Sequence, residues 1–450
     1  MRFPTSITSL VPISLILGAA PARAADGVRV PLFARQTNRM CSACHLNAHY
    51  IELTEMGRTF KLNAYRLTKV DSLGSGDIQE NTAAGRRELL LNLVPLLGFM
   101  VQTSYTATQR AQPGTQNGSA LLPDQLSLFM GGRVSPKTGG FVQVTYSAPD
   151  GSFGIDNVDL RFADSARLFS KGALVGLSVN NNPTIQDLWN TTPAWSFPWA
   201  SSSMAPTPAA TTLIDGNLGQ RVAGVSASMM WNKRVFGELG VYRSAIIGHS
   251  GPLDSTASDA ISGVAPYWRV AFPRSRGNNY LMVGAYGLSA NIYPAGVTGP
   301  TNRFTDVAFD IMDQVKLGLQ AVALHGTWIH ETQRWAPGEA ANASNTLNTY
   351  RMDVQWHLAH RFALMLSPFA TSGSSDSVLY APEAMSGSRA GSPNSDGLIA
   401  EVDVNPWDNV RVQFQYVAYG KFNGSSQDYD GFARNAADNN TLYVVAWVIF

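Results

Sequence analysis

The sequence predicts an all-β protein: a 16-stranded antiparallel transmembrane β-barrel whose bore is plugged by a small, mostly irregular N-terminal segment. First, charged residues make up only 14% of the 450 residues, against about 25% in an average soluble domain. Second, no apolar run after residue 24 reaches the roughly 18 residues that suggest a membrane-spanning helix. Third, apolar and polar residues alternate with period two from about residue 88 to the last residue, which is typical of strands. A membrane barrel combines these features, because its signal is spread over many short segments.

The N-terminus has the features of an export signal. Arg2 supplies the charged start, residues 10–20 form the apolar middle, and Ala22-Arg23-Ala24 is an A-x-A cleavage site. The apolar run is too short to span a bilayer as a helix. We therefore expect residues 1–24 to be a signal peptide and the mature chain to lie outside the cytoplasm.

Two regions follow the signal. Residues 25–87 mix short apolar stretches with basic residues and end in a polar, glycine-containing linker over 71–87. Residues 88–450 show the period-two alternation throughout. We expect the first region to hold one short helix within irregular chain and to plug the bore. The second region is expected to form the barrel.

Sixteen strands are predicted from the alternation and from the turn residues between them. In one of the clearest, Val307, Phe309 and Ile311 alternate with Asp306 and Asp310, so that one face would meet lipid and the other the lumen. The predicted strands cover about 96–108, 125–134, 140–148, 156–164, 172–180, 220–231, 234–247, 264–273, 279–291, 304–314, 317–331, 347–358, 361–372, 396–404, 409–421 and 440–450.

The connections mostly alternate between short and long, as in bacterial outer-membrane barrels with short periplasmic turns and long outer loops. Short turns are expected at 232–233, 313–314, 359–360 and 405–408. They follow even-numbered strands, which places both chain ends and the N-terminal segment on the periplasmic side. The long loop over 181–219 is expected outside the barrel, as a mobile polar loop, as a lid over the plug or as a contact surface for an external donor. The alternative fold is a soluble β-sandwich or propeller.

Residues 41–45 carry the strongest chemical signal in the chain. They read Cys41-Ser42-Ala43-Cys44-His45, the Cys-x-x-Cys-His attachment sequence of c-type haem. Cys41 and Cys44 would form thioethers with the haem, and His45 would bind the iron as the proximal ligand. The chain has only two cysteines, and both lie in this motif. The alternatives are a disulfide, half of a zinc site or a thioredoxin-like redox pair. We expect one covalently bound haem c.

The second axial ligand of the iron has several candidates. Met56 and His49 are the leading ones, and Met40 or an inward-facing barrel histidine such as His357 are further ones. His49 lies four residues after His45, so on one helix both would point to the same side. A methionine ligand would raise the reduction potential, which suits a donor such as Fe(II).

The predicted lumen is acidic, because alternation turns more carboxylates than arginines inward. An acidic lumen would attract Fe²⁺ or another cation and repel anions. The alternative is that the carboxylates pair with the basic residues of the plug, including Arg35, Arg39, Arg58, Lys61 and Arg66. The inward-facing charged residues are Asp159, Glu238, Asp306, Asp310, Asp353, Glu401 and Asp403, with Arg161, Arg351 and Arg411.

The N-terminal region resembles the outer-membrane cytochrome–porin fusions. The resemblance rests on residues 31–65: Pro31-Leu32-Phe33-Ala34-Arg35-Gln36-Thr37, the haem motif, and Gly57-Arg58-Thr59-Phe60-Lys61-Leu62-Asn63-Ala64-Tyr65. The order of the two regions also matches. This chain has Asn47-Ala48-His49 where the family usually has an aromatic–proline pair. It has Met56 where members often have Phe, and Ala64 where they often have Gly.

The resemblance implies an outer-membrane electron conduit, in which one c-type haem is fused to a 16-stranded porin. The best-known members of this family oxidise Fe(II). The protein would take electrons from an extracellular donor, with Fe(II) the expected one, and pass them to a periplasmic c-type cytochrome. It would thus act as an iron(II):cytochrome oxidoreductase. A haem held inside the bore could be near both faces of a hydrocarbon layer about 30 Å thick.

Two other functions remain open from the sequence. One is a haem-containing porin with a sensing or gating role. The other is an extracellular reductase that sends electrons outward, because the sequence does not fix the haem potential. Outer-membrane lipid is the expected surrounding in every case. A net charge of +1 gives no indication of nucleic-acid binding.

Overall fold

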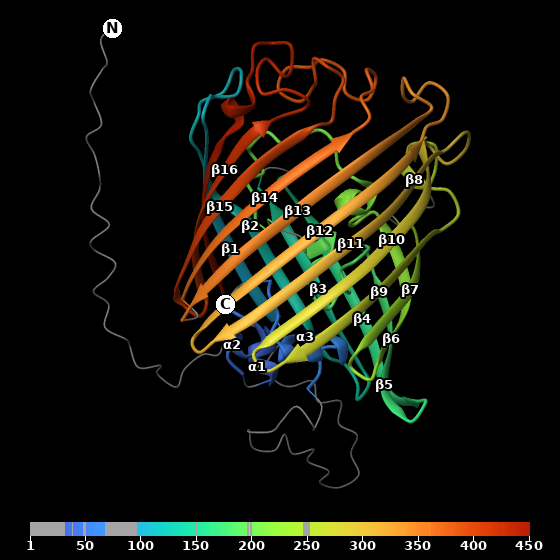
Figure 1. The fold of residues 1–450 in the computed structure, drawn as a ribbon, viewed down its shortest axis with the longest axis vertical. Helices are drawn as coiled ribbons and strands as arrows, with labels where there is room; N and C mark the ends of the chain where they lie inside the picture. Colours follow the sequence, from blue (N-terminus) through green and yellow to red (C-terminus); the bar gives the residue numbers. More distant parts are fainter. Residues whose placement is uncertain are drawn as a thin grey trace, which may run out of the picture.

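A closed sheet of long, tilted strands forms the molecule, and three short helices lie at one end of it (Figure 1). The computed structural model describes residues 32–37, 39–47, 51–67, 97–148, 151–195, 198, 200–245, 253–359 and 361–450. The predicted signal peptide at 1–24, the linker at 71–87 and the boundary between residues 87 and 88 lie outside these residues. No helix in the described ranges is long and apolar enough to cross a membrane.

The sheet has seventeen strands, of which β8 has four residues. The strands are β1 (Leu97–Thr108), β2 (Ser119–Arg133), β3 (Thr138–Ser147), β4 (Ser152–Leu168), β5 (Lys171–Asn180), β6 (Val222–Trp231), β7 (Val235–Ser244), β8 (Ser258–Ile261), β9 (Ala265–Arg276), β10 (Asn279–Ala295), β11 (Asn302–Leu317), β12 (Gln320–Arg334), β13 (Ser344–Leu358), β14 (Phe362–Gly373), β15 (Ser395–Trp407), β16 (Val410–Lys421) and β17 (Thr441–Ile449).

The barrel closes because β1 pairs with β17 as well as with β2, and every pairing is antiparallel. The short strand β8 pairs with β10, while β7 pairs directly with β9. Without β8, sixteen of the seventeen strands therefore form the closed barrel. This confirms the predicted fold class, and each predicted segment corresponds to one of these sixteen strands. The sequence did not reveal β8, because four residues are too few to show a period.

The two faces of the strands follow the predicted alternation. In β11, Asp306 and Asp310 are buried, whereas Val307, Phe309 and Ile311 are between 37% and 52% exposed. The outer face is therefore apolar, as a barrel in contact with lipid requires. All ten charged residues predicted to face inward are buried or partly buried.

The short turns gather at one end of the barrel and the longer loops mostly at the other (Figure 1). The short turns cover 134–137, 169–170, 232–234, 277–278, 318–319, 359–361 and 408–409. The turn predicted at 313–314 is wrong, because β11 continues to Leu317 and the chain reverses at Gly318, where φ is +68°. The turn predicted at 405–408 begins later, because β15 continues to Trp407.

The N-terminal segment lies at the short-turn end. It contains three short helices where one was predicted, α1 (Leu32–Thr37), α2 (Cys41–Cys44) and α3 (Glu55–Leu62), joined by irregular chain. We call residues 32–67 the plug. Its α1 packs against β2, and the last residue of the chain pairs with Phe99 at the start of β1. Phe450, the start of the barrel and the plug therefore share one end (Figure 1).

The loop after β5 enters the barrel, which corrects its predicted place outside. Trp189 is 1% exposed, packs against Phe236 of β7 and donates its indole N–H to the Tyr280 hydroxyl of β10 at 2.8 Å. Further along, the backbone N–H groups of Leu213 and Ile214 donate to inward-facing carboxylates of β12 and β11. We call residues 181–219 the interior loop. It includes η2 (Pro193–Trp195) and η3 (Leu213–Asn217), whereas η4 (Ala436–Asn439) precedes β17.

Candidate functional site

The Cys-x-x-Cys-His motif forms a single helical turn followed by an extended residue. Cys41 and Cys44 are the first and last residues of α2, so their spacing places both side chains on one face. The His45 backbone N–H donates to the Cys41 carbonyl at 2.9 Å and ends the turn. His45 then pairs with Leu53 in an isolated β-bridge.

Thr54 and Gly57 attach this turn to α3. The Thr54 backbone N–H donates to the Cys44 carbonyl at 2.9 Å, and its hydroxyl donates to the Ala43 carbonyl at 2.6 Å. The same hydroxyl oxygen caps α3 by accepting from the Gly57 N–H. A Cβ atom at Gly57 would lie 2.3 Å from the Cys44 carbonyl oxygen, so only glycine fits without a shift. The glycine at position 57 is therefore explained by its close packing against the Cys44 carbonyl.

The side chains of Cys41 and Cys44 are both partly buried. Burial raises the pKa of Cys41 to about 11, and the Asp408 carboxylate adds to this effect. Burial also raises the pKa of Cys44 to about 11, although Arg39 opposes it. A thioredoxin-like cysteine would have a lowered pKa. The thiols are not joined in a disulfide.

Cys41, Cys44 and His45 line one cavity inside the barrel. Its volume is about 1020 Å³, at the upper end of the roughly 300–1,000 Å³ of pockets that hold small molecules and cofactors. Aromatic side chains of the plug and the wall, such as Phe33, Phe60 and Phe129, complete the lining. Two thiols one turn apart, a neighbouring imidazole and a large, partly aromatic space are what a covalently bound haem needs. The residues present therefore fit that group.

The candidates for the second axial ligand lie in different places. Met56 is the second residue of α3 and is not among the described residues that line the cavity. His49 lies outside the described residues. Met40 lines the cavity, and so does Met100 of β1, whose side chain is 2% exposed. Met100 is absent from the predicted candidates, although its inward position in a predicted strand was a usable signal.

Charged and polar groups fix the plug within the barrel. The Arg58 guanidinium donates to the Leu53 carbonyl and to Gln314 of β11, and it stacks 3.7 Å from the Tyr280 ring centroid. The Lys61 ammonium nitrogen donates to the Asp187 carbonyl and to the Asn190 side chain of the interior loop.

Further hydrogen bonds attach other parts of the plug to the wall and to the interior loop. The Tyr65 hydroxyl donates to Asp159 of β4 at 2.5 Å. Asn405 of β15 donates to the Asn47 side chain, and the Asn190 side chain donates to the Ile51 carbonyl, each at 2.8 Å.

The lumenal carboxylates pair chiefly with arginines of the barrel wall. Arg161 pairs with Asp159, Arg269 with Asp310 and Asp187, and Arg411 with Glu401 and Asp403. Arg351 pairs with Asp215 of the interior loop. The plug supplies Tyr65 to this network. The predicted pairing with the basic residues of the plug is therefore not the main arrangement among the described side chains.

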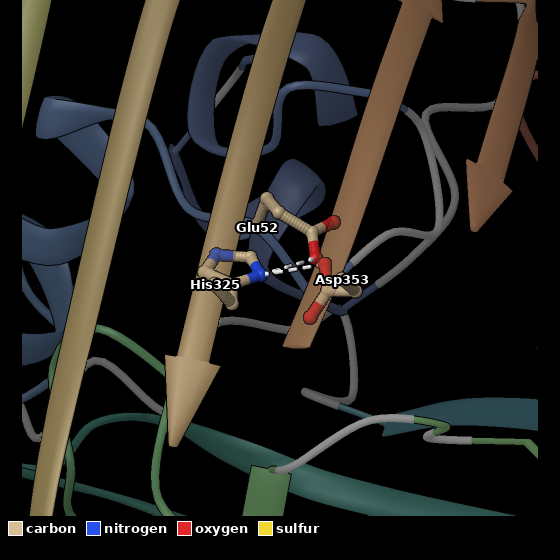
Figure 2. A group of neighbouring side chains, drawn as sticks. All are labelled: Glu52, His325 and Asp353. Carbon is tan, nitrogen blue, oxygen red and sulfur yellow. Dashed lines mark hydrogen bonds and ion pairs between the residues drawn. The ribbon is translucent and has the colours of Figure 1, made fainter. Parts of the chain in front are cut away.

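One polar cluster was not found from the sequence. Glu52 of the plug, His325 of β12 and Asp353 of β13 point toward one another (Figure 2). His325 and Asp353 are register partners on neighbouring strands, and His325 Nδ1 lies 3.0 Å from Asp353 Oδ1 and 3.8 Å from Glu52 Oε1. Burial raises the pKa of Glu52 to about 7, with His325 opposing and Asp353 adding to the rise. More than 270 residues separate Glu52 from its partners, so no local motif could reveal the cluster.

No protein-family model matches the chain, and no curated protein matches it. Several solved outer-membrane proteins are similar in structure. The anion-selective porin from Comamonas acidovorans is 11% identical, with a TM-score of 0.47 over 79% of this chain and 98% of that chain. The outer membrane channel DcaP of Acinetobacter baumannii is 11% identical, with a TM-score of 0.44 over 79% and 96%. A loop-deletion mutant of OmpT, an outer membrane protein of Vibrio cholerae, is 9% identical, with a TM-score of 0.44 over 79% and 98%. The assignment of a porin-like barrel rests on the closed strand order of this chain itself.

Proposed function

We propose that the protein is an outer-membrane electron conduit with one covalently bound haem c. It would oxidise an extracellular donor, Fe(II), and reduce a periplasmic c-type cytochrome. The observation that carries the proposal is the position of the haem-attachment motif, which lines a cavity of about 1020 Å³ inside a closed barrel. The apolar outer face of that barrel supports a location in the outer membrane.

The residues of this chain would hold the group and keep its surroundings rigid. Cys41 and Cys44 would attach it, and His45 would be the proximal iron ligand. Met56 or His49 remain the predicted distal ligands. When bound, haem c supplies one-electron chemistry, since its iron alternates between ferric and ferrous forms. The buried anchors at Arg58 and Lys61 limit movement of the plug.

The periplasmic partner would meet the protein at the short-turn end. Cys41 lies at this end, where its Sγ is 3.9 Å from the Asp408 carbonyl in the turn between β15 and β16. Short turns leave the plug less covered there than long loops would. A small periplasmic cytochrome is therefore expected to dock on this end, with the haem segment entering the barrel from the periplasm.

The test is a visible spectrum of the oxidised, detergent-solubilised protein before and after Fe(II) is added without oxygen. We expect the haem bands to shift to the reduced form. The Cys41→Ala/Cys44→Ala variant should lack covalent haem, and Ser42→Ala in the same turn should keep it. Bands that stay oxidised with Fe(II) but are reduced by dithionite would reject Fe(II) as the donor. A wild-type protein without covalent haem would reject the whole proposal.

A second candidate function is a haem-containing porin with a sensing or gating role. The porin-like barrel and the cavity that remains beside the plug favour it. An outward-directed reductase would use the same parts, and the measured potential of the haem would separate it from an Fe(II) oxidase.

A further inference from the structure

Glu52, His325 and Asp353 form a cluster at the contact between the plug and the barrel wall (Figure 2). One side-chain nitrogen or oxygen atom from each residue lies within 4.8 Å of the other two. An ion bound about 2.1 Å from each ligand requires ligand atoms about 3–4 Å apart. The cluster thus needs only small side-chain movements to surround one ion.

Two of these buried side chains have polar atoms without a partner. Glu52 is 2% exposed and His325 is 8% exposed. Among the described residues, Glu52 Oε2 and His325 Nε2 accept or donate no hydrogen bond. Such atoms are rare in folded proteins and call for an explanation. Glu52 Oε2 is the unpartnered atom that an ion in the cluster would use, whereas His325 would bind through Nδ1, the ring nitrogen that faces both carboxylates (Figure 2). The other Glu52 oxygen accepts from Gln355, which also donates to Asp353 and so orients both carboxylates.

A small cavity adjoins the cluster and is lined by all three residues. Its volume is about 20 Å³, just above the roughly 10–15 Å³ that one water-sized occupant needs. Ile51, Asn190 and Trp195 line both this cavity and the large one, so the two spaces are neighbours. Arg351 also lines both, and its guanidinium is engaged with Asp215.

We propose that Glu52, His325 and Asp353 bind one divalent transition-metal cation of the Fe²⁺ class. Imidazole suits Fe²⁺ and Zn²⁺, carboxylates suit Mn²⁺, and a mixed set accepts all of these. The two carboxylates also supply the negative charge that a buried dication requires.

The identity of the ion as the Fe(II) donor rests on the proposed function, whereas binding itself does not. The position agrees with a donor site, because the Glu52 carbonyl accepts from the Leu46 N–H at 2.9 Å. Leu46 directly follows His45, so the ion would be held next to the haem-attachment segment.

The test is equilibrium dialysis of the full-length, haem-containing protein against Mn²⁺, with bound metal counted per chain. Mn²⁺ is the probe because it does not reduce the haem. We expect one Mn²⁺ per wild-type chain. Glu52→Gln and His325→Ala should each weaken binding by about 100-fold or more, because even the loss of an outer-shell partner costs about 10–100-fold. Asp353→Asn should act in the same direction.

Two variants serve as matched controls. Glu55→Gln changes the same charge at an exposed position of the plug, and His330→Ala removes a histidine from the opposite face of β12. Both should bind Mn²⁺ like the wild type. Binding that survives in Glu52→Gln and His325→Ala, or no binding by the wild type, would overturn the site. Circular dichroism and haem content show which variants are folded.

The failure of this site can be told apart from the failure of the proposed function. If Mn²⁺ binds as expected but Fe(II) does not reduce the haem, the site stands and the donor is wrong. If Fe(II) reduces the haem equally in the wild type and Glu52→Gln while Mn²⁺ does not bind, the conduit stands and the site is rejected.

Discussion

Lys61 of the plug has a pKa far from that of a lysine in water. Its ammonium group is buried in the bore, where its nitrogen donates to the Asp187 carbonyl and to Asn190. Burial lowers the pKa of Lys61 from 10.5 to about 7, and Arg161 adds to this while nearby carboxylates oppose it. Between about pH 7 and 10.5 the unfolded chain therefore binds a proton that the folded chain releases. The free energy of unfolding should rise with pH across this window.

Lys61→Met should remove that pH dependence. Relative to the variant, the wild type is expected to gain up to about 1.4 kcal/mol of unfolding free energy per pH unit above pH 7. Guanidinium unfolding of both proteins at pH 7, 8 and 9 measures the difference. Lys316→Met, at an exposed position of β11, is the matched control and should follow the wild type. Equal pH slopes for the wild type and Lys61→Met would contradict the prediction.

Only part of the candidate site can be identified from the sequence alone. The Cys-x-x-Cys-His motif is local, so the sequence alone identifies Cys41, Cys44 and His45. The Glu52 cluster and Met100 become neighbours of the plug only through the closed sheet. The sequence shows that His325 and Asp353 lie in strands, but not that they are paired across β12 and β13.

The position of the interior loop could not be predicted from the sequence. Its polar composition is typical of an external loop, yet the polar groups are used inside the bore. The Asp187 carboxylate accepts from the backbone N–H groups of Trp189, Thr191 and Thr192 and pairs with Arg269 at 3.2 Å. This one side chain therefore both shapes the loop and attaches it to β9.

Asp187→Ala should release the interior loop without opening the barrel. The loss of a buried acceptor costs about 1–3 kcal/mol, and Arg269 keeps Asp310 as a partner. We expect faster cleavage within residues 181–219 by limited proteolysis in detergent. Asp254→Ala is the matched control, because that exposed carboxylate accepts only from Thr256 among the described residues. An unchanged cleavage rate would show that the loop has other sufficient anchors.

Strands could be predicted where their two faces differ in polarity, whereas the positions of the turns could not always be predicted. Apolar and polar residues alternate through β11, so its existence and the face to which each residue points followed from the sequence. The pair Asp313-Gln314 resembles a turn because it is polar. Gln314 is in fact polar because it faces the lumen, where it hydrogen-bonds to Leu53 and Arg58 of the plug. A polar residue that is needed for a contact with the plug can therefore be mistaken for a turn residue.

In the whole molecule, the plug and the interior loop together occupy the bore. Removing residues 32–67 should therefore raise ion conductance, since the wall alone is a porin-like barrel. Conductance of the full-length and deleted proteins in planar bilayers measures the effect. A large increase would favour a plugged conduit, whereas a full-length protein that already conducts as well as the deletion would favour the porin function.

The partners of the plug are distributed around the barrel, on β4, β11, β13 and β15. They stand in their final positions only once the first and last strands have paired. A barrel that closed with one strand shifted by one residue would turn these side chains to the lipid face. Stable docking of the plug should therefore require a barrel that has closed in the correct register. Chains that close incorrectly would leave residues 32–67 accessible to proteases, and correctly closed chains would protect them.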